Sequence, residues 1–465
     1  MSPDGSTGAL FGAKVALSRA IGAASRRSGR GGGTTLPGRV LLRMEPESIA
    51  ALGLRLAGGT TLVSATNGKT TTAGMIAAIL AAAGRHPVHN RAGSNMTWGV
   101  ATALLEQRGE EGLFEVDEAW LPRVAGQLDP SLIVLGNLFR DQLDRYGEME
   151  DLADDWARTV AARAGRTGFV LNADDPLIAD LGREPSGERR EGILYFGIED
   201  DSQALPELQH AFDAKHCRRC GHPYAYERAF VGHLGHYSCP NCGAERPRPE
   251  VAATAIELRG MDGSRASVRT PQGEILLDLP VPGLYNVYNA LAAVAAGLRL
   301  GVAPELIATA LGEMRAAFGR VETIAVGDVA VSILLIKNPA GANEVLRTLL
   351  LESRVGEPID LWIALNDRIA DGRDVSWIWD ADFELLAGAV RRVVCSGTRA
   401  PEMALRLKYA GWPEAAIEVV PEIGASLDAA VAAAPGGLFA LPTYTALLEL
   451  RKLLADRGLA QEFWR

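Results

Sequence analysis

A short run near residue 66 constrains the fold of this chain more than any other feature. An apolar stretch that begins at Thr61 leads directly into Thr66-Asn67-Gly68-Lys69-Thr70, and an Ala-rich stretch with helical spacing follows through Leu80. The order of strand, glycine-containing loop and helix is typical of phosphate-binding loops, because glycine lets the backbone approach phosphate closely. The general pattern asks for another glycine at Val63, so the match is to a shorter variant. The run predicts a nucleotide site on an α/β sheet.

The side chains of the loop suit a nucleoside triphosphate. A lysine supplies charge to the β and γ phosphates, and a hydroxyl at Thr70 or Thr71 can ligate Mg²⁺ at the positive end of the following helix. The alternative is a glycine turn beside an exposed lysine, which the strand and helix on either side disfavour. We therefore expect ATP to bind through Thr66, Asn67, Gly68, Lys69, Thr70 and Thr71.

Acids and amides follow three further apolar runs. From Thr61 to about Gly319, short apolar runs alternate with helical stretches, which predicts a parallel sheet covered by helices on both faces. Ligands of such sheets gather at the carboxyl ends of the strands. Glu115 is the expected Mg²⁺ ligand beside the loop, whereas Asp117 and Glu118 could equally be solvated. The runs with polar ends are 114–118, 133–137 and 169–175.

Two Cys-x2-Cys pairs, separated by eighteen residues, form the second motif. A glycine follows each pair and permits the turn that directs both thiolates to one ion, so we expect structural Zn²⁺ in a tetrahedral four-sulfur site. Unmetallated cysteines or two disulfides are the alternatives, and a nearby histidine could replace a ligand. Because the ribbon lies inside a predicted ATPase domain, we expect it to brace that domain or to provide a docking surface rather than to bind nucleic acid. The expected ligands are Cys217, Cys220, Cys239 and Cys242, and the nearby histidines are His216, His222, His233 and His236.

The chain is too long, at 465 residues, for one core, and its pattern divides it into three segments. Residues 1–54 carry a basic helix, which we expect to dock on its own domain rather than on a membrane. Residues 55–317 form the central ATP-binding domain, with the zinc ribbon at about 208–248, and residues 318–465 form a Rossmann-like α/β domain.

Composition and charge restrict the function. The net charge of −10 argues against a general nucleic-acid binder, because phosphate backbones attract basic surfaces. No apolar run is long enough to span a bilayer, and the N-terminus lacks the apolar core of a secretory signal. We expect a cytoplasmic protein that can be peripheral at the inner face of the plasma membrane.

Four motifs together resemble the Mur ligase family of ATP-dependent amide-forming enzymes, and the resemblance covers nearly the whole chain after the N-terminal segment. Within that family the four-cysteine insertion and the runs 337–341 and 366–380 are similar to ligases that amidate lipid II. The motifs are Thr66-Asn67-Gly68-Lys69-Thr70-Thr71, Asn172-Ala173-Asp174-Asp175-Pro176, Tyr285-Asn286-Val287-Tyr288-Asn289-Ala290 and Gly319-Arg320-Val321-Glu322.

The resemblance implies amidation of the D-glutamate α-carboxylate in the lipid II stem peptide. ATP would activate the carboxylate as an acyl phosphate, and ammonia would come from glutamine through a GatD-like glutaminase subunit in a heterodimer. By resemblance Lys69 and Mg²⁺ act on the phosphates, Glu115 holds the metal, Asn289 and Arg320 contact nucleotide and Asn338 lies near it.

Three departures from the family pattern stand out. Ala65 replaces the usual glycine at the start of the loop, and Gln142 stands where a histidine usually precedes the Asp-Arg pair. No lysine occurs between Lys69 and Lys215, so the carbamoylated lysine of amino-acid-adding Mur ligases is missing. Two rival functions stay open: addition of an amino acid, as in folate polyglutamylation, and a zinc-ribbon ATPase driven by nucleic acid.

The chain lacks the pieces of a glutaminase site. Cys395 is the one cysteine outside the ribbon, and no histidine follows His236, so a Cys-His pair would have to form between domains. A partner glutaminase is therefore expected. By resemblance Asp374 reaches across the interface and orients the partner's histidine. The alternative is that Asp371, Arg373 and Asp374 form an ordinary charged surface turn.

Overall fold

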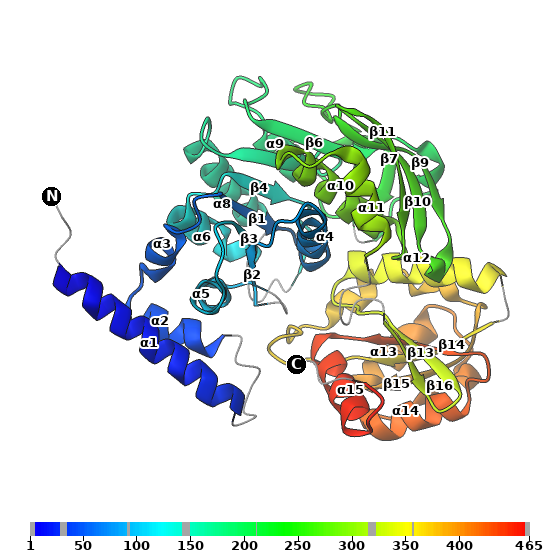
Figure 1. Ribbon diagram of the computed structural model, residues 1–465. Coiled ribbons are helices and arrows are strands. Elements are labelled where there is room, and N and C mark those ends of the chain that lie inside the picture. The colour runs from blue at the N-terminus through cyan, green and yellow to red at the C-terminus, as the bar shows by residue number, and fades with distance from the viewer. Residues whose placement is uncertain are drawn as a thin grey trace.

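The computed structural model describes residues 5–27, 35–90, 94–141, 149–210, 212–314, 322–355 and 358–460. Within these residues the chain forms two α/β bodies, one around a nine-stranded sheet and one around a six-stranded sheet (Figure 1). The first body contains the phosphate-loop sequence and the four ribbon cysteines. The predicted fold class is confirmed, whereas the residue limits given to the three segments stay predictions.

The large sheet has the strand order β11-β10-β9-β6-β5-β4-β1-β3-β2. Neighbours from β2 to β9 are parallel, and β10 and β11 extend the sheet as an antiparallel hairpin. The strands are β1 (Thr60–Ser64), β2 (Val88–His89), β3 (Gly112–Glu115), β4 (Leu132–Leu135), β5 (Gly168–Asn172), β6 (Ile193–Ile198), β9 (Val251–Leu258), β10 (Ser264–Thr270) and β11 (Gly273–Leu279).

The inner strands are apolar at nearly every position because helices cover both faces of the sheet. Successive side chains of β1 point to opposite faces, so Leu62 and Val63 enter two separate apolar cores. The Val63 core contains α4 and α10, and the Leu62 core contains the helices on the other face. The helices are α4 (Lys69–Ala82), α5 (Thr97–Glu106), α6 (Leu121–Leu128), α8 (Met149–Ala162), α9 (Pro176–Leu181), α10 (Leu284–Arg299) and α11 (Pro304–Gly312).

The N-terminal segment contributes α1 (Gly5–Arg27), α2 (Leu36–Met44) and α3 (Ser48–Gly53). One face of α1 docks on this body, because Lys14 pairs with Glu45 at 2.8 Å and Arg19 Nε donates to Leu105 O at 2.7 Å. The docking expected from the sequence is therefore present. No helix among the described residues is long and apolar enough to cross a membrane.

The second body has the strand order β12-β13-β17-β14-β15-β16, in which only the β12–β13 hairpin is antiparallel. The C-terminal segment has five apolar runs, and each contains one strand: 328–336, 359–365, 391–396, 415–420 and 436–441. The elements are β12 (Glu322–Val326), β13 (Val329–Ile333), α12 (Pro339–Val355), β14 (Ile359–Ala364), β15 (Val390–Ser396), α13 (Ala400–Tyr409), β16 (Ile417–Val419), α14 (Ile423–Ala432), β17 (Leu438–Pro442) and α15 (Tyr444–Asp456).

Helix α12 lies between the two sheets, and several of its side chains reach the first body (Figure 1). Arg347 Nη1 donates to Phe230 O at 2.7 Å, and the Glu352 carboxylate accepts from the backbone N–H of Met261. A further contact joins His210 Nδ1 to Asp382 Oδ1 at 2.7 Å. These contacts fix the second body over the carboxyl edge of the large sheet.

Candidate active site

The predicted phosphate loop connects β1 to α4, and Gly68 is the N-cap of that helix. Gly68 has φ +86°, a conformation that non-glycine residues rarely adopt. A Cβ at this position would lie 1.9 Å from Asn289 Oδ1. Glycine is thus required both by the backbone conformation and by the close approach of α10.

Lys69 is buried and already paired. Its Nζ lies 3.0 Å from Glu118 Oε2 and donates to Ala65 O at 3.0 Å. Burial alone would lower the pKa of Lys69, but Glu118 and the neighbouring acids outweigh it, so the pKa is raised. Burial opposes ionisation of Glu118 as well, yet Lys69 and Lys337 hold the pKa of that carboxyl below its usual value. Both groups are therefore charged at neutral pH.

Glu115 lies at the end of β3 against the first turn of α4. Its Oε1 accepts from Thr70 Oγ1 at 2.9 Å and from Asn95 Nδ2 at 3.3 Å. A hydroxyl and a carboxylate side by side are hard oxygen donors of the kind that Mg²⁺ prefers. Two acids of the run 114–118 therefore contact the phosphate loop: Glu115 through Thr70 and Glu118 through Lys69. The sequence alone left the role of Glu118 undecided.

Three asparagine side chains, each from a different part of the fold, form hydrogen bonds to the loop and to the first turn of α4. Asn137, after β4, accepts from Asn67 N at 2.9 Å and donates to Asn67 O at 3.0 Å. Asn289, on α10, accepts from Thr72 Oγ1 at 3.2 Å. Asn338, at the start of α12, exchanges two amide hydrogen bonds with the side chain of Asn67, at 3.0 and 3.2 Å.

Lys337 connects the second body to the same loop. Its Nζ donates to Thr66 O at 3.0 Å and pairs with Asp141 Oδ2 at 2.5 Å. The sequence alone indicated Lys337 only as the first residue of the run 337–341. A usable signal was present, because Lys337 follows the apolar run 328–336 just as the acids follow their strands.

A cavity opens beside the loop, between α10 and α12. The loop side of the cavity is polar and is formed by Asn67, Gly68 and Thr71. The opposite side is largely apolar. Its side chains come from the ribbon hairpin, from the start of α10 and from α12 with the segment before it, and they include Val231, Leu234, Val281, Tyr285, Leu335 and Val345. One end of the cavity thus suits phosphate and the other an uncharged planar group.

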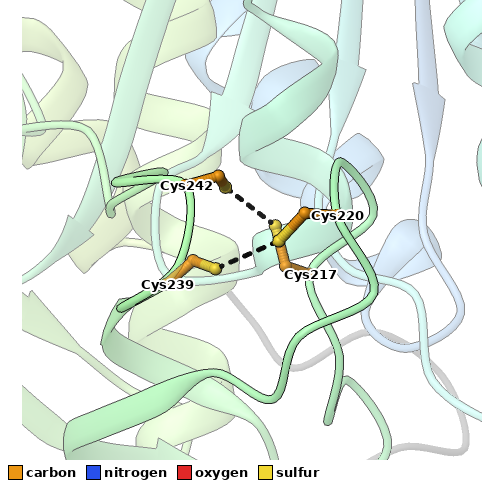
Figure 2. Close-up of side chains that lie close together, drawn as sticks. All are labelled: Cys217, Cys220, Cys239 and Cys242. Carbon is orange, nitrogen blue, oxygen red and sulfur yellow. Dashed lines mark hydrogen bonds between the residues drawn. The ribbon is translucent and has the colours of Figure 1, made fainter.

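The four ribbon cysteines converge in one cluster (Figure 2). Their Sγ atoms all lie within 4.8 Å of one another, with separations of 3.6 Å for Cys217–Cys242 and 3.5 Å for Cys220–Cys239. A tetrahedral site with Zn–S bonds of about 2.3 Å places sulfur atoms roughly 3.8 Å apart, so the donor set fits zinc. All four cysteines are free thiols in this structure.

Both cysteine pairs have the same turn. Gly221 N donates to Cys217 O at 2.8 Å and Gly243 N donates to Cys239 O at 3.0 Å, with φ near +70° at both glycines. The ribbon histidines are not part of the cluster among the described residues. His236 Nε2 contacts Ile198 O at 2.9 Å instead. The hairpin of the ribbon consists of β7 (Ala225–Val231) and β8 (Leu234–Ser238).

Asp374 lies on the second body, in the loop after β14. Its Oδ1 accepts from Ser376 N at 2.8 Å, which lowers the pKa of the Asp374 carboxyl and keeps it ionised. A cleft runs from Asp374 to Lys337 and Asn338, and Arg140, Asp371, Trp377 and Asp380 also line it. Asp374 therefore borders a cleft that also reaches Lys337 and Asn338, the two residues of the second body that contact the phosphate loop.

The surface-turn alternative was wrong for Asp371. Asp371 is buried, and its Oδ1 accepts from Thr445 N at 2.7 Å at the start of α15. Asn366 ties the same loop to α15 through Thr445 Oγ1 at 2.9 Å. The loop that carries Asp374 is thus anchored at two points. Burial raises the pKa of Asp371, although the hydrogen bonds from Thr445 oppose that shift.

Cys395 is inert. Its side chain is fully buried in β15, and burial raises the pKa of the thiol to about 12. Thiolate, rather than thiol, is the nucleophile in cysteine chemistry. The other four cysteines belong to the cluster.

Comparison with known proteins gives the family. The Mur ligase middle domain matches residues 63–244, and the MurT ligase C-terminal domain matches residues 335–447. The chain is 33% identical over 441 residues to the lipid II isoglutaminyl synthase (glutamine-hydrolyzing) subunit MurT of Streptococcus pneumoniae R6, covering 93% of this chain and 94% of that subunit. The chain belongs to the MurT family of Mur ligases. It is an ATP-dependent ligase.

A second MurT subunit, from Staphylococcus aureus strain COL, is 31% identical over 445 residues and covers 95% of this chain and 97% of its own length. Among solved structures, a pseudomurein peptide ligase type C from Methanothermus fervidus has a TM-score of 0.65 at 22% identity, over 86% of this chain and 79% of that one. MurF from Acinetobacter baumannii has a TM-score of 0.64 at 20% identity, over 91% and 80%. These structures share the Mur ligase fold.

In this MurT-family chain the structure brings the six loop residues together with Glu115, Asn289 and Asn338. Arg320 lies outside the described residues. Asp374 is separate from the loop but borders the cleft that reaches Asn338. The sequence placed Asn137 at one of the polar strand ends, but it gave no role to the hairpin residues Val231 and Leu234, because their contacts join segments far apart in the chain.

Proposed function

We propose that this chain is the ligase subunit of a lipid II isoglutaminyl synthase. It uses ATP to convert the D-glutamate α-carboxylate of the stem peptide into an amide, with ammonia from a GatD-like glutaminase subunit. The observation that carries the proposal is the sequence identity of 31% to 33% between this chain and two MurT subunits, in alignments that cover more than nine-tenths of each chain. The phosphate loop, with its charged Lys69 and its adjacent Glu115, supplies the matching chemistry.

The cavity supports one orientation of ATP. The triphosphate would lie on the loop at Gly68 and Thr71, which line the cavity. N–H groups at the start of α4 and the charge of the adjacent Lys69 favour anions there. The base lies at the apolar end, against Val281 and Leu335. Thr70 and Glu115 would hold Mg²⁺, which would supply positive charge beside the phosphates.

The first chemical step is phosphoryl transfer. A carboxylate oxygen of D-glutamate attacks the γ-phosphorus, the bond to the β-phosphate oxygen breaks and ADP leaves, which produces an acyl phosphate. Negative charge spreads over the transferred group in this step, and Lys69 and the loop N–H groups stabilise it. Lys69 must shift from Glu118 toward the phosphates, and Glu118 then remains beside it as a counter-charge.

The second step is acyl transfer to ammonia. The ammonia nitrogen attacks the acyl carbon and loses a proton to water, phosphate leaves and the amide forms. Asp374 serves the supply of ammonia rather than this step. Its ionised carboxyl is suited to orient the imidazole of a Cys-His pair on the glutaminase, as the acid of a catalytic triad does.

The test is mass spectrometry of lipid II incubated with this chain and Mg-ATP. Ammonium alone should support amidation, and glutamine should support it only when the glutaminase is added. The soluble nucleotide-linked stem peptide, run in parallel, establishes which acceptor is used. Absence of amidation of either acceptor from any nitrogen source would refute the proposal.

Replacing Gly68 with alanine should weaken ATP binding. The change forces a strained backbone and a contact with Asn289, and strain of about 1–3 kcal/mol corresponds to a loss of affinity of roughly 5- to 150-fold. Isothermal titration calorimetry measures the effect. Gly74→Ala is the matched control, because Gly74 lies in the same helix with nothing within 4 Å of an added Cβ. Equal affinities of the two variants would contradict the prediction.

We also propose that the four cysteines bind one structural Zn²⁺. Cys239→Ser removes a buried ligand, so zinc content should fall from about one equivalent to none and the unfolding midpoint should drop by about 5 °C or more. Plasma mass spectrometry and calorimetry measure the two quantities. Cys395→Ala controls for loss of a buried thiol and should keep its zinc. Full zinc content in Cys239→Ser would exclude the four-thiolate site.

A further inference from the structure

The tip of the ribbon hairpin is inserted beside the nucleotide cavity. Gly232 and His233 join β7 to β8, and the residues on either side, Val231 and Leu234, are buried and line the cavity. Gly235 N donates to Asp174 O at 2.9 Å and so attaches β8 to the first body. The ribbon is thus part of the cavity wall rather than a separate appendage.

His233 is the residue that this arrangement leaves unexplained. Its side chain is fully buried, and neither ring nitrogen has a hydrogen-bond partner among the described residues. Its ring packs on Phe139, with centroids 4.7 Å apart and planes at 53°, and its Nε2 lies 3.5 Å from Asp175 Oδ2. A buried polar ring with unsatisfied nitrogens is destabilising, so filling space does not account for a histidine here.

The residues that His233 packs against belong to the network that holds the phosphate loop in place. Asp175 Oδ2, next to the ring, accepts from Leu138 N at 2.8 Å. Phe139 N, under the ring, donates to Thr66 Oγ1 at 3.1 Å. The segment that begins at Asn137 is therefore held by the hairpin on one side and holds the phosphate loop on the other.

We propose that His233 is a positioning residue through which the ribbon fixes the phosphate loop, so that zinc occupancy and nucleotide affinity are coupled. The inference rests on the proposed nucleotide site and adds a role for the ribbon to it. Zinc bound by the cysteines before β7 and after β8 would hold both ends of the hairpin that places His233 against Phe139 and Asp175. Coupling of this kind is reciprocal for binding free energies, so bound nucleotide must also raise the affinity for zinc.

The first test measures the affinity of the full chain for a fluorescent N-methylanthraniloyl derivative of ATP. His233→Ala should weaken binding by about 5- to 100-fold with zinc content unchanged, because typical couplings are of this size. His222→Ala should bind as the parent does, since the His222 ring is exposed and its Nδ1 contacts the carbonyl of the adjacent Pro223. Equal affinity of His233→Ala and the parent overturns the inference. Absence of binding by the parent itself refutes the proposed function instead.

The second test needs no substitution and covers the case in which His233→Ala fails to fold. The affinity of the parent chain for zinc is measured by equilibrium competition with a chromogenic chelator, with and without Mg-ATP. The zinc dissociation constant should fall by the factor by which zinc strengthens nucleotide binding. An unchanged dissociation constant, with ATP bound at saturation, overturns the coupling.

Discussion

Lys69→Ala should reduce lipid II amidation by about 10³-fold or more with either nitrogen source, because phosphoryl transfer depends on charge stabilisation. The substitution has a second effect that must be separated from the first. Glu118 is buried, and without Lys69 it loses its nearest counter-charge, so the variant is also expected to be less stable. The double variant Lys69→Ala/Glu118→Gln removes that stability defect without restoring the chemistry.

Initial rates of amidation and of ADP formation, together with thermal unfolding, distinguish these effects. Lys215→Ala is the matched control, since Lys215 is an exposed lysine of the same body. The prediction fails if the double variant regains stability and more than about a tenth of the parent rate. In that case Lys337, which also lies beside the loop, would supply the charge.

Asp374→Asn should separate the two nitrogen sources. Replacing the acid of a triad by its amide lowers turnover by about 10⁴-fold, so amidation from glutamine should fall by up to that factor in the complex with the glutaminase. Amidation from ammonium should change by less than about twofold, because Asp374 lies on a loop of the second body, outside the nucleotide cavity. Mass spectrometry of lipid II with each nitrogen source measures both rates.

Asp380→Asn is the control for this experiment, because Asp380 is an acid that borders the same cleft, where it lies 3.4 Å from Arg140 Nη1. Parallel loss of both activities in Asp374→Asn would show that Asp374 acts on the ligase reaction itself. Asp371 offers an internal check. It anchors the Asp374 loop to Thr445, so Asp371→Asn should lower the glutamine-dependent rate in the same selective way.

The phosphate loop was predictable because its signal is local: one strand, one glycine and one helix adjoin in the chain. The position of Glu115 followed from topology, since parallel strands that alternate with helices bring their carboxyl ends to one edge. The contribution of the ribbon hairpin did not follow from either rule. Val231 reaches the cavity because the ribbon hairpin folds back beside the carboxyl end of β5, where Gly235 N donates to Asp174 O, and periodicity does not record such contacts.

In the second body, too, some features were predictable from the sequence and others were not. Its alternation of strands and helices was evident from apolar runs, and all five runs contain a strand. The burial of Asp371 was not evident, because a charged turn is usually solvated and its partner Thr445 lies 74 residues away.

The paired amides of Asn67 and Asn338 join positions 271 residues apart. At a synthesis rate of about 5–20 residues per second, roughly 15 to 50 s separate the emergence of the two halves of this contact. The first body can collapse during that interval, but its phosphate loop lacks the contacts from Lys337 and Asn338 until the second body has folded. We therefore expect nucleotide capture to be a late event in the maturation of the nascent chain, with tight binding of ATP only by molecules whose translation has passed both sheets.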